Sequence, residues 1–255
     1  MTSMPGSAAR TDATMPRLPE FVRRFTRAER WVHRSTATLM MICLFTAACL
    51  YLPPLAEIVG RRRLVVTVHE WSGIALPLPA LAGLASRAFR HDLRRLNRFT
   101  SYDGSWLRAA LRRRLYQARP AGKFNAGQKL YAAFAAGAVL VMLGTGLLMM
   151  FPHLTAVVWR TGATFVHDWL ALAVAFAVAG HWWMASHDPE ARRGMRTGFV
   201  TPAWARLNHP HWDHAKEAAD AADAAEVGAT PDAGQAASAS APSSGSGGPP
   251  RGQGS

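Results

Sequence analysis

The sequence has few cysteines and lacks the short motifs of several common redox centres. Only Cys43 and Cys49 occur among 255 residues, six positions apart in one apolar stretch, so neither a disulfide framework nor a zinc site is indicated. No Cys-x-x-Cys-His run is present, which excludes covalent haem attachment through that motif. Motifs for molybdopterin, iron–sulfur clusters and nucleotides are absent too, so we expect none of these cofactors on this chain.

Neither end of the sequence has the composition of a folded domain. Residues 1–20 lack an apolar h-region, so we predict no cleavable signal peptide and assign them to a mobile tail. Residues 216–255 are rich in Ala, Asp, Ser, Gly and Pro, which bury too little apolar surface to offset the entropy lost on ordering. We therefore predict disorder there and one folded domain over residues 21–215.

Four apolar blocks dominate that domain. Each is long enough to cross a hydrocarbon core of about 30 Å as a helix. Buried helices of a soluble protein would need polar amphipathic helices around them, and too few residues remain to supply these. We therefore predict an all-α integral membrane bundle of four helices, at about residues 31–52, 64–86, 130–151 and 164–185.

The net charge of +13 would favour nucleic-acid binding in a soluble protein, but here the arginines flank the spans, and no nucleic-acid partner is expected. Eleven Lys or Arg residues lie between residues 90 and 129, whereas the connection between the third and fourth spans carries only Arg160. Positive-inside counting thus places both termini and the 88–129 loop in the cytoplasm, although the Arg61–Arg63 triplet falls outside. Residues 105–116 show the pattern of a basic amphipathic helix on anionic lipid.

Four of the ten histidines lie within the spans, where an ionisable side chain is costly and usually functional. In the predicted topology His69 and His167 lie near the outer face, and His33 and His181 lie near the inner face. The fourteen residues from His167 to His181 turn a helix through nearly whole turns and advance it by about 21 Å, so both face one way. One helix can then supply an axial imidazole to each of two haems stacked along the membrane normal.

Simpler interpretations of these residues stay open. A single membrane histidine is as often an interhelical hydrogen-bonding residue as a ligand. Span glycines would let a flat macrocycle approach the backbone, but small residues are equally expected where helices pack; they are Gly73, Gly144, Gly146 and Gly180. The NHPHWDH run at 208–214 is a possible metal site, although interface contacts are more common for such a run beside a membrane.

Several segments resemble the cytochrome b (gamma) subunit of respiratory formate dehydrogenases, within the wider family of di-haem b-type membrane anchors shared with nickel–iron hydrogenases. The resemblance covers roughly residues 20–213, whereas the arginine-rich loop and the tail depart from the family pattern. The matching segments are ERWVHR at 29–34, VHEW at 68–71, GKFNAGQK at 122–129, GH at 180–181 with its spacing from His167, and MRTGFVTPAWARLNHPHW at 195–212.

The resemblance implies two haem b groups, with the iron atoms held by His69 and His167 outside and by His33 and His181 inside. It also implies a quinone site near the inner haem, where Asn125 and Gln128 would hydrogen-bond a quinone carbonyl. Lys123 and Lys129 would favour a developing quinol anion there. Spacing alone favours a different role for Asn125, as the N-cap of the third span with Gln128 completing a capping box.

The implied function is that of a multi-pass subunit of the cell membrane with no dehydrogenase active site of its own. It would carry electrons from an iron–sulfur subunit, partnered by a molybdo- or tungsto-enzyme subunit, to menaquinone or ubiquinone. Two alternatives stay open. The donor could be a hydrogenase or another molybdoenzyme, or the chain could be a haem-free membrane transporter or scaffold whose histidines relay protons or pack.

Overall fold

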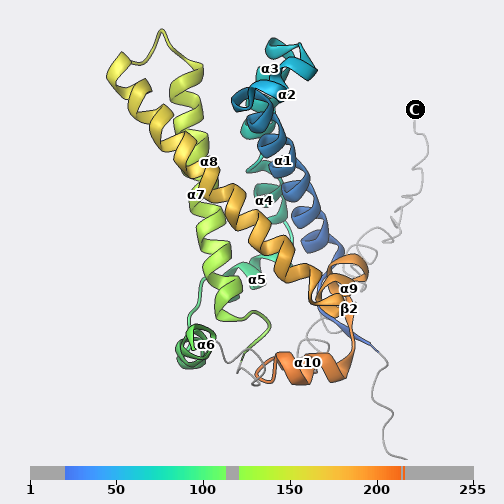
Figure 1. Cartoon of the computed structure of the whole chain (residues 1–255). Helices are drawn as coiled ribbons and strands as arrows, with labels where there is room; N and C mark the ends of the chain where they lie inside the picture. The colour runs from blue at the N-terminus through green and yellow to red at the C-terminus, as the bar shows by residue number, and fades with distance from the viewer. Residues whose placement is uncertain (1–20, 113–120, 214, 216–255) are drawn as a thin grey trace, which may run out of the picture. The chain divides into compact units, whose positions relative to one another are not determined.

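A computed structural model of the protein describes residues 21–112, 121–213 and 215, so the predictions for the tails lie outside the described residues. Within that part, the chain is almost entirely helical (Figure 1). In chain order the elements are β1 (Val22–Arg23), α1 (Arg27–Tyr51), α2 (Pro53–Val59), α3 (Arg62–Ala75), α4 (Leu78–Gly83), α5 (Arg87–Leu96), α6 (Ser101–Leu111), α7 (Ala126–Met150), α8 (Val157–Ser186), α9 (Pro189–Thr197), β2 (Phe199–Val200) and α10 (Pro202–Asn208).

Four segments are long and apolar enough to cross a membrane, which confirms the predicted number of spans. The largest difference in bounds is at the fourth span, where α8 begins at Val157. The prediction started later because Arg160 is polar, but Arg160 continues the helix and its side chain donates to Pro152 O. Large apolar side chains of the spans are exposed; Phe176, for example, is 71% exposed. A lipid environment suits such a surface. The four spans are Arg27–Tyr51, Arg62–Gly83, Ala126–Met150 and Val157–Ser186.

The second span is interrupted at its prolines. Helix α3 ends at Ala75 and α4 begins at Leu78, directly after Pro77. Because proline has no N–H to donate, the ladder cannot run through this point. At the break, Leu76 N donates to the carbonyl three residues back, Gly73 O, and the helical ladder resumes where Leu81 N donates to Pro77 O.

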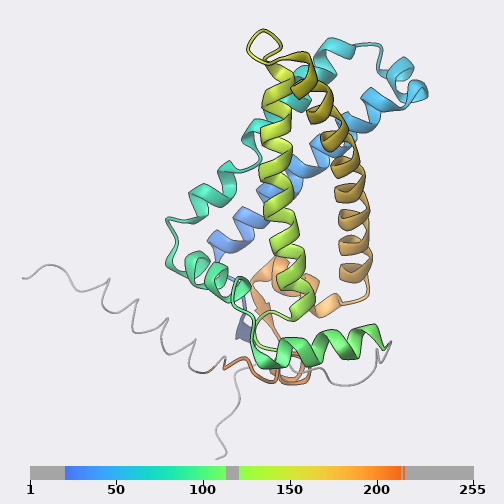
Figure 2. The ribbon, with the colours of Figure 1, turned by 90° about the vertical axis from the view of Figure 1, so that its left-hand side faces the viewer.

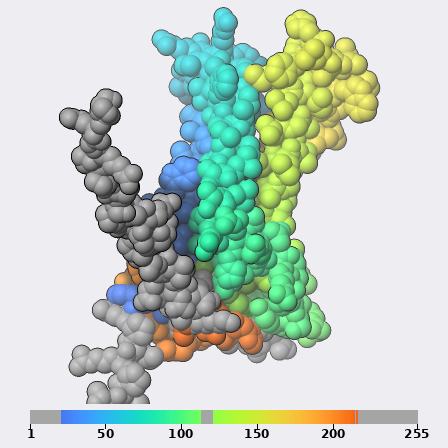
Figure 3. All heavy atoms as spheres, turned by 180° about the vertical axis from the view of Figure 1, so that it is seen from behind, coloured from blue at the N-terminus to red at the C-terminus, as the bar shows by residue number. Residues whose placement is uncertain are grey.

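The long helices form two closely packed pairs. Helix α1 packs against α3 and α4, α7 packs against α8, and α3 also contacts α7. Figure 2 shows α7 and α8 running side by side, and Figure 3 shows from behind how α3 and α4 lie in front of α1. The short connections α2 and 151–156 lie at one end of these helices, and α5, α6, α9 and α10 lie at the other (Figure 1).

A small two-stranded sheet joins the segments before α1 and after α9. Strands β1 and β2 pair antiparallel, with Val22 opposite Val200. These two valines form a buried cluster with Ala205 and Trp212. In the described part of the chain this sheet is the one departure from the predicted all-α fold, and two residues per strand are too few for an alternating pattern to reveal.

The 88–129 loop contains the helices α5 and α6. Helix α6 covers Ser101–Leu111, so it begins four residues before the predicted amphipathic helix, and the predicted end at 113–116 lies outside the described residues. Its earlier start has a local cause, because Thr100 and Asp103 form a capping box. A Cβ at Gly127 of α7 would lie 2.8 Å from the Trp106 ring, so part of the face assigned to lipid packs on protein.

Candidate functional site

The four span histidines lie as two facing pairs. The ring centroids of His33 on α1 and His181 on α8 are 6.3 Å apart. Those of His69 on α3 and His167 on α8 are also 6.3 Å apart. The structure therefore brings together the residues that depth alone had paired, with α8 contributing one ring to each pair.

This spacing fits an iron ion held between two imidazoles. Such an ion lies about 2 Å from each ligating nitrogen, and each ring centre lies about 1 Å beyond its nitrogen, so the ring centres are separated by about 6 Å. Rings in direct stacking contact would be nearer, as shown by Tyr131 and His181, whose ring centroids are 4.9 Å apart. Both histidine pairs thus match axial ligation better than mutual packing.

The surroundings also leave room for a macrocycle around each axis. His33 and His181 have exposed side chains, and His69 and His167 are only partly buried. A Cβ added at Gly73, Gly144 or Gly180 would meet nothing within 4 Å in the described part of the chain, so close helix packing does not explain these glycines. At Gly146 the added atom would lie 3.6 Å from the His167 ring, in ordinary contact.

Three side chains around the histidines were missed by the sequence reasoning. Thr46 and Thr145 have their hydroxyl oxygens 2.9 Å from Nδ1 of His69 and His167, respectively. Tyr131 stacks on the ring of His181 with an interplanar angle of 17°. These contacts join different helices, so their only signal in the sequence is a polar residue within an apolar span, which does not identify its partner.

The capping box expected at the start of α7 is present. Asn125 Oδ1 accepts from Gln128 N at 2.9 Å, and Gln128 Oε1 accepts from Asn125 N at 3.0 Å. This confirms the role that spacing favours. Both contacts use side-chain oxygens, so the amide nitrogens of the two side chains take no part in the box and keep their hydrogens for another acceptor.

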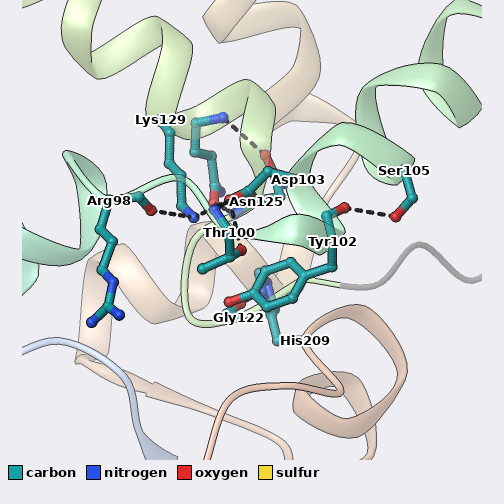
Figure 4. Close-up of polar contacts among 10 residues, drawn as sticks. Arg98, Thr100, Tyr102, Asp103, Ser105, Gly122, Asn125, Lys129 and His209 are labelled. Carbon is teal, nitrogen blue, oxygen red and sulfur yellow. Dashed lines mark hydrogen bonds and ion pairs between the residues drawn. The ribbon is translucent and has the colours of Figure 1, made fainter.

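Lys129 is held beside Asn125 by a buried ion pair (Figure 4). Its Nζ lies 2.6 Å from Asp103 Oδ2 and donates to Arg98 O at 2.9 Å. Burial favours the neutral form of Asp103, but hydrogen bonds from Lys129 and Thr100 outweigh it and lower the pKa of this carboxyl. The charge of Lys129 is therefore matched by Asp103, and the expected action on a quinol anion stays a prediction.

Lys123 is paired in the same way. Its Nζ lies 2.8 Å from Asp92 Oδ2, and the two side chains are 4% and 6% exposed. The carboxyl group of Glu29 lies near enough to act on the charge of Asp92. Burial raises the pKa of Asp92 to about 8, against the opposing effect of Lys123 and with the support of Glu29. A carboxyl that titrates near neutral pH can pass a proton on.

The buried arginine of the small sheet lies in the same region. The Arg24 guanidinium donates to Lys123 O at 3.1 Å and lies 4.6 Å from the ring centre of Trp204. Burial lowers the pKa of Arg24 to about 10, although Asp188 and Asp92 act in the opposite direction. Arg24 thus connects α10 to the segment that leads into α7.

The histidine run after α10 makes packing contacts. His209 is 4% exposed and its Nδ1 donates to Gly122 O at 2.6 Å. The His211 ring stacks on Tyr102 with centroids 4.8 Å apart. No group of three His, Cys, Asp or Glu side chains suited to a metal ion occurs among residues 21–112 and 121–213, and His214 lies outside the described residues. The interface role is the one that the described residues support.

Comparisons with known proteins identify the family of this chain. A family model described as prokaryotic cytochrome b561 matches residues 24–198, which include all four span histidines. The cytochrome b556 subunit of formate dehydrogenase from Haemophilus influenzae is 27% identical over 197 residues, covering 71% of this chain and 80% of that protein. The cytochrome b556(Fdn) subunit of the nitrate-inducible formate dehydrogenase from Escherichia coli is 24% identical over 196 residues, covering 72% and 88%. The cytochrome b556(fdo) subunit of formate dehydrogenase from the same organism is 23% identical over 195 residues, covering 74% and 90%.

Proposed function

Because the chain belongs to the prokaryotic cytochrome b561 family, we propose that it is the membrane cytochrome b subunit of a formate dehydrogenase. In this proposal it carries electrons from an iron–sulfur partner subunit, through two b haems, to a quinone of the cell membrane. The observation that carries the proposal is the equal 6.3 Å spacing of two histidine pairs inside the matched region. The multi-pass architecture, with four apolar spans, fits a membrane anchor for soluble partner subunits.

The four histidines have distinct tasks. His69 and His167 would hold the iron of an outer haem, and His33 and His181 would hold that of an inner haem. A haem b supplies one-electron transfer, and two imidazoles occupy both axial positions and so disfavour oxygen chemistry. Because His167 and His181 stand about 21 Å apart along one rigid helix, α8 fixes the separation of the two sites.

The start of α7 is the proposed quinone site. The amide hydrogens of Asn125 and Gln128, which the capping box leaves free of its own bonds, would donate to a quinone carbonyl. The buried ion pair of Lys129 and Asp103 would hold that helix start in place. Asp92, with its raised pKa of about 8, lies in the same cytoplasmic layer and would accept and release the protons that quinone reduction consumes.

The proposed orientation has both termini, α5, α6, α9 and α10 in the cytoplasm. The iron–sulfur partner, with its molybdo- or tungsto-enzyme subunit, would then dock outside, where the exposed Arg61–Arg63 triplet begins α3. Electrons would move inward from His69 and His167 to His33 and His181. Proton uptake on the cytoplasmic side would make this transfer conserve energy.

Single alanine variants test the haem assignment. His181→Ala should lose the inner haem and electron transfer to quinone but keep the outer haem, because the outer iron retains both of its ligands. His167→Ala should lose the outer haem instead, and His153→Ala, in the exposed 151–156 connection, should keep both. The measurement is the haem content and the reduced-minus-oxidised spectrum of purified protein. Loss of the outer haem in His181→Ala would show that the pairing is wrong.

The same preparation separates the competing functions. A haem-free transporter or scaffold would show no b-type bands. A cytochrome that serves a hydrogenase would be reduced by hydrogen and not by formate in membranes that contain the whole complex. Reduction of the haems by formate, followed by reoxidation with a quinone analogue, is the result that the proposed function requires.

A further inference from the structure

Two threonine hydroxyls lie against the two outer histidines. Thr46 on α1 contacts His69 on α3, and Thr145 on α7 contacts His167 on α8, both with 2.9 Å between Oγ1 and Nδ1. Each threonine lies on the helix that precedes its histidine. Two helical hairpins therefore make the same contact, at the same length, with the two members of one facing pair.

The hydrogen of each hydroxyl is already engaged within its own helix. Thr46 Oγ1 donates to Ile42 O at 2.7 Å, and Thr145 Oγ1 donates to Val141 O at 2.8 Å. A hydroxyl that donates its one hydrogen to this carbonyl meets the ring as an acceptor. That arrangement places the ring hydrogen on Nδ1 and leaves the lone pair on Nε2.

The inner pair is held differently. Within the described residues, no hydroxyl bonds to the ring of His33 or His181, and the neighbour of His181 is the stacked ring of Tyr131. A hydrogen bond accepted from the distal nitrogen makes an imidazole a more basic ligand, which stabilises ferric iron. Stacking lacks that effect, so the two sites are built with different ligand basicity.

Hydrogen bonding within one helix does not by itself explain the two contacts between threonine and histidine. Threonines in membrane helices commonly donate to a carbonyl of the preceding turn, and Thr161 on α8 does so with Val157 O. Thr46 and Thr145 make this ordinary bond and, in addition, present the same oxygen to a histidine. The second contact occurs twice, on equivalent hairpins and at the same site.

We propose that Thr46 and Thr145 are positioning residues for the outer haem, which fix the axial tautomer of His69 and His167 and lower the reduction potential of that haem relative to the inner one. The proposal rests on the function proposed above. Electrons then enter at a site whose ferric form is stabilised and leave it readily for the inner site. Because two threonines act on one iron, their effects should accumulate.

The test is a redox titration of Thr46→Val, Thr145→Val and the double variant, purified with haem and followed by optical and low-temperature EPR spectra. Each single variant should shift the outer haem to more positive potential and change its EPR g values, and the double variant should shift it further. The inner haem should titrate as in the wild type. Thr161→Val removes a threonine that bonds only its own helix, and this control should leave both haems unchanged.

Serine variants keep the test decisive if valine weakens haem binding. Thr46→Ser and Thr145→Ser restore the hydroxyl, so wild-type potentials in both would support the proposal even if the valine variants lost the outer haem. Unchanged outer potential in the valine variants, or equal shifts in both haems, would overturn it. Failure of the underlying function would look different. The wild-type protein would then show no outer haem, or His167→Ala would have the same haem content as the wild type.

Discussion

Asn125 provides the sharpest test of the quinone site, because the oxygen and the nitrogen of its side-chain amide have different roles that can be changed separately. The oxygen closes the capping box with Gln128, and the amide nitrogen is the proposed donor to a quinone carbonyl. Asn125→Asp keeps an acceptor oxygen but removes every side-chain hydrogen. Asparagine, aspartate and serine are about equally good N-caps, so this variant should keep the stability of α7.

The expected magnitudes follow from the bonds involved. Loss of one donor to the quinone should cost about 0.5–1.5 kcal/mol, which corresponds to roughly a 2- to 12-fold loss in quinone affinity or turnover. Asn125→Ala should lose the same contact and, in addition, about 1 kcal/mol of stability from the missing cap. Asn125→Ser is the neutral control for the charge that aspartate introduces, since it also caps the helix but its hydroxyl reaches less far.

The assay compares haem reoxidation by a soluble quinone analogue with thermal unfolding of the same preparations. Both haem spectra should be unchanged in all three variants, because Asn125 contacts neither histidine pair. Wild-type reoxidation kinetics in the aspartate and serine variants would refute the reasoning and leave Asn125 with the cap as its only role.

Three further predictions concern the buried residues Lys129 and His209 and the orientation across the membrane. Lys129→Met should lower the free energy of unfolding by about 3–5 kcal/mol, since it leaves Asp103 buried without its ion pair, and adding Asp103→Asn should recover part of the loss in detergent unfolding measurements. Burial and Arg24 lower the pKa of His209 from 6.5 to about 3. The contribution of its neutral form to stability is therefore full above pH 6.5 and is lost as the pH falls. The free energy of unfolding should fall by up to about 1.4 kcal/mol per pH unit below pH 6.5, and His209→Gln should reduce this pH dependence. In a chain without its native cysteines, Arg61→Cys should react with an impermeant thiol reagent in intact cells and Arg112→Cys should not; the reverse labelling would show that the topology is inverted.

The spans and the histidine pairing were accessible from sequence because both follow from one-dimensional quantities. Hydropathy over about twenty residues identifies a span, and helical rise and twist give the depth and direction of His167 and His181. The break at Pro77 follows from covalent structure alone. None of these inferences needs knowledge of which helix packs beside which.

The contacts that sequence could not give depend on the relative rotation of helices. Thr46 meets His69 only because α1 and α3 pack with those faces together, and apolar spans carry no strong periodic signal for that choice. The ion pairs of Lys123 and Lys129 could not be predicted for a related reason. Their partners, Asp92 and Asp103, lie on helices of the 88–129 loop, whose docking position no local pattern specifies.

The pairing of β1 with β2 has a consequence for the order of assembly. Both outer histidines and their threonines have been synthesised once the ribosome passes residue 167. The two helices of the inner pair, α1 and α8, are tied together outside the membrane only when Val200 reaches Val22, and Arg30 and Arg34 then donate to the carbonyl of residue 196. Biogenesis should therefore complete the outer site first, and chains released before residue 200 would lack the strand pairing and the hydrogen bonds that join α1 to the segment after α8.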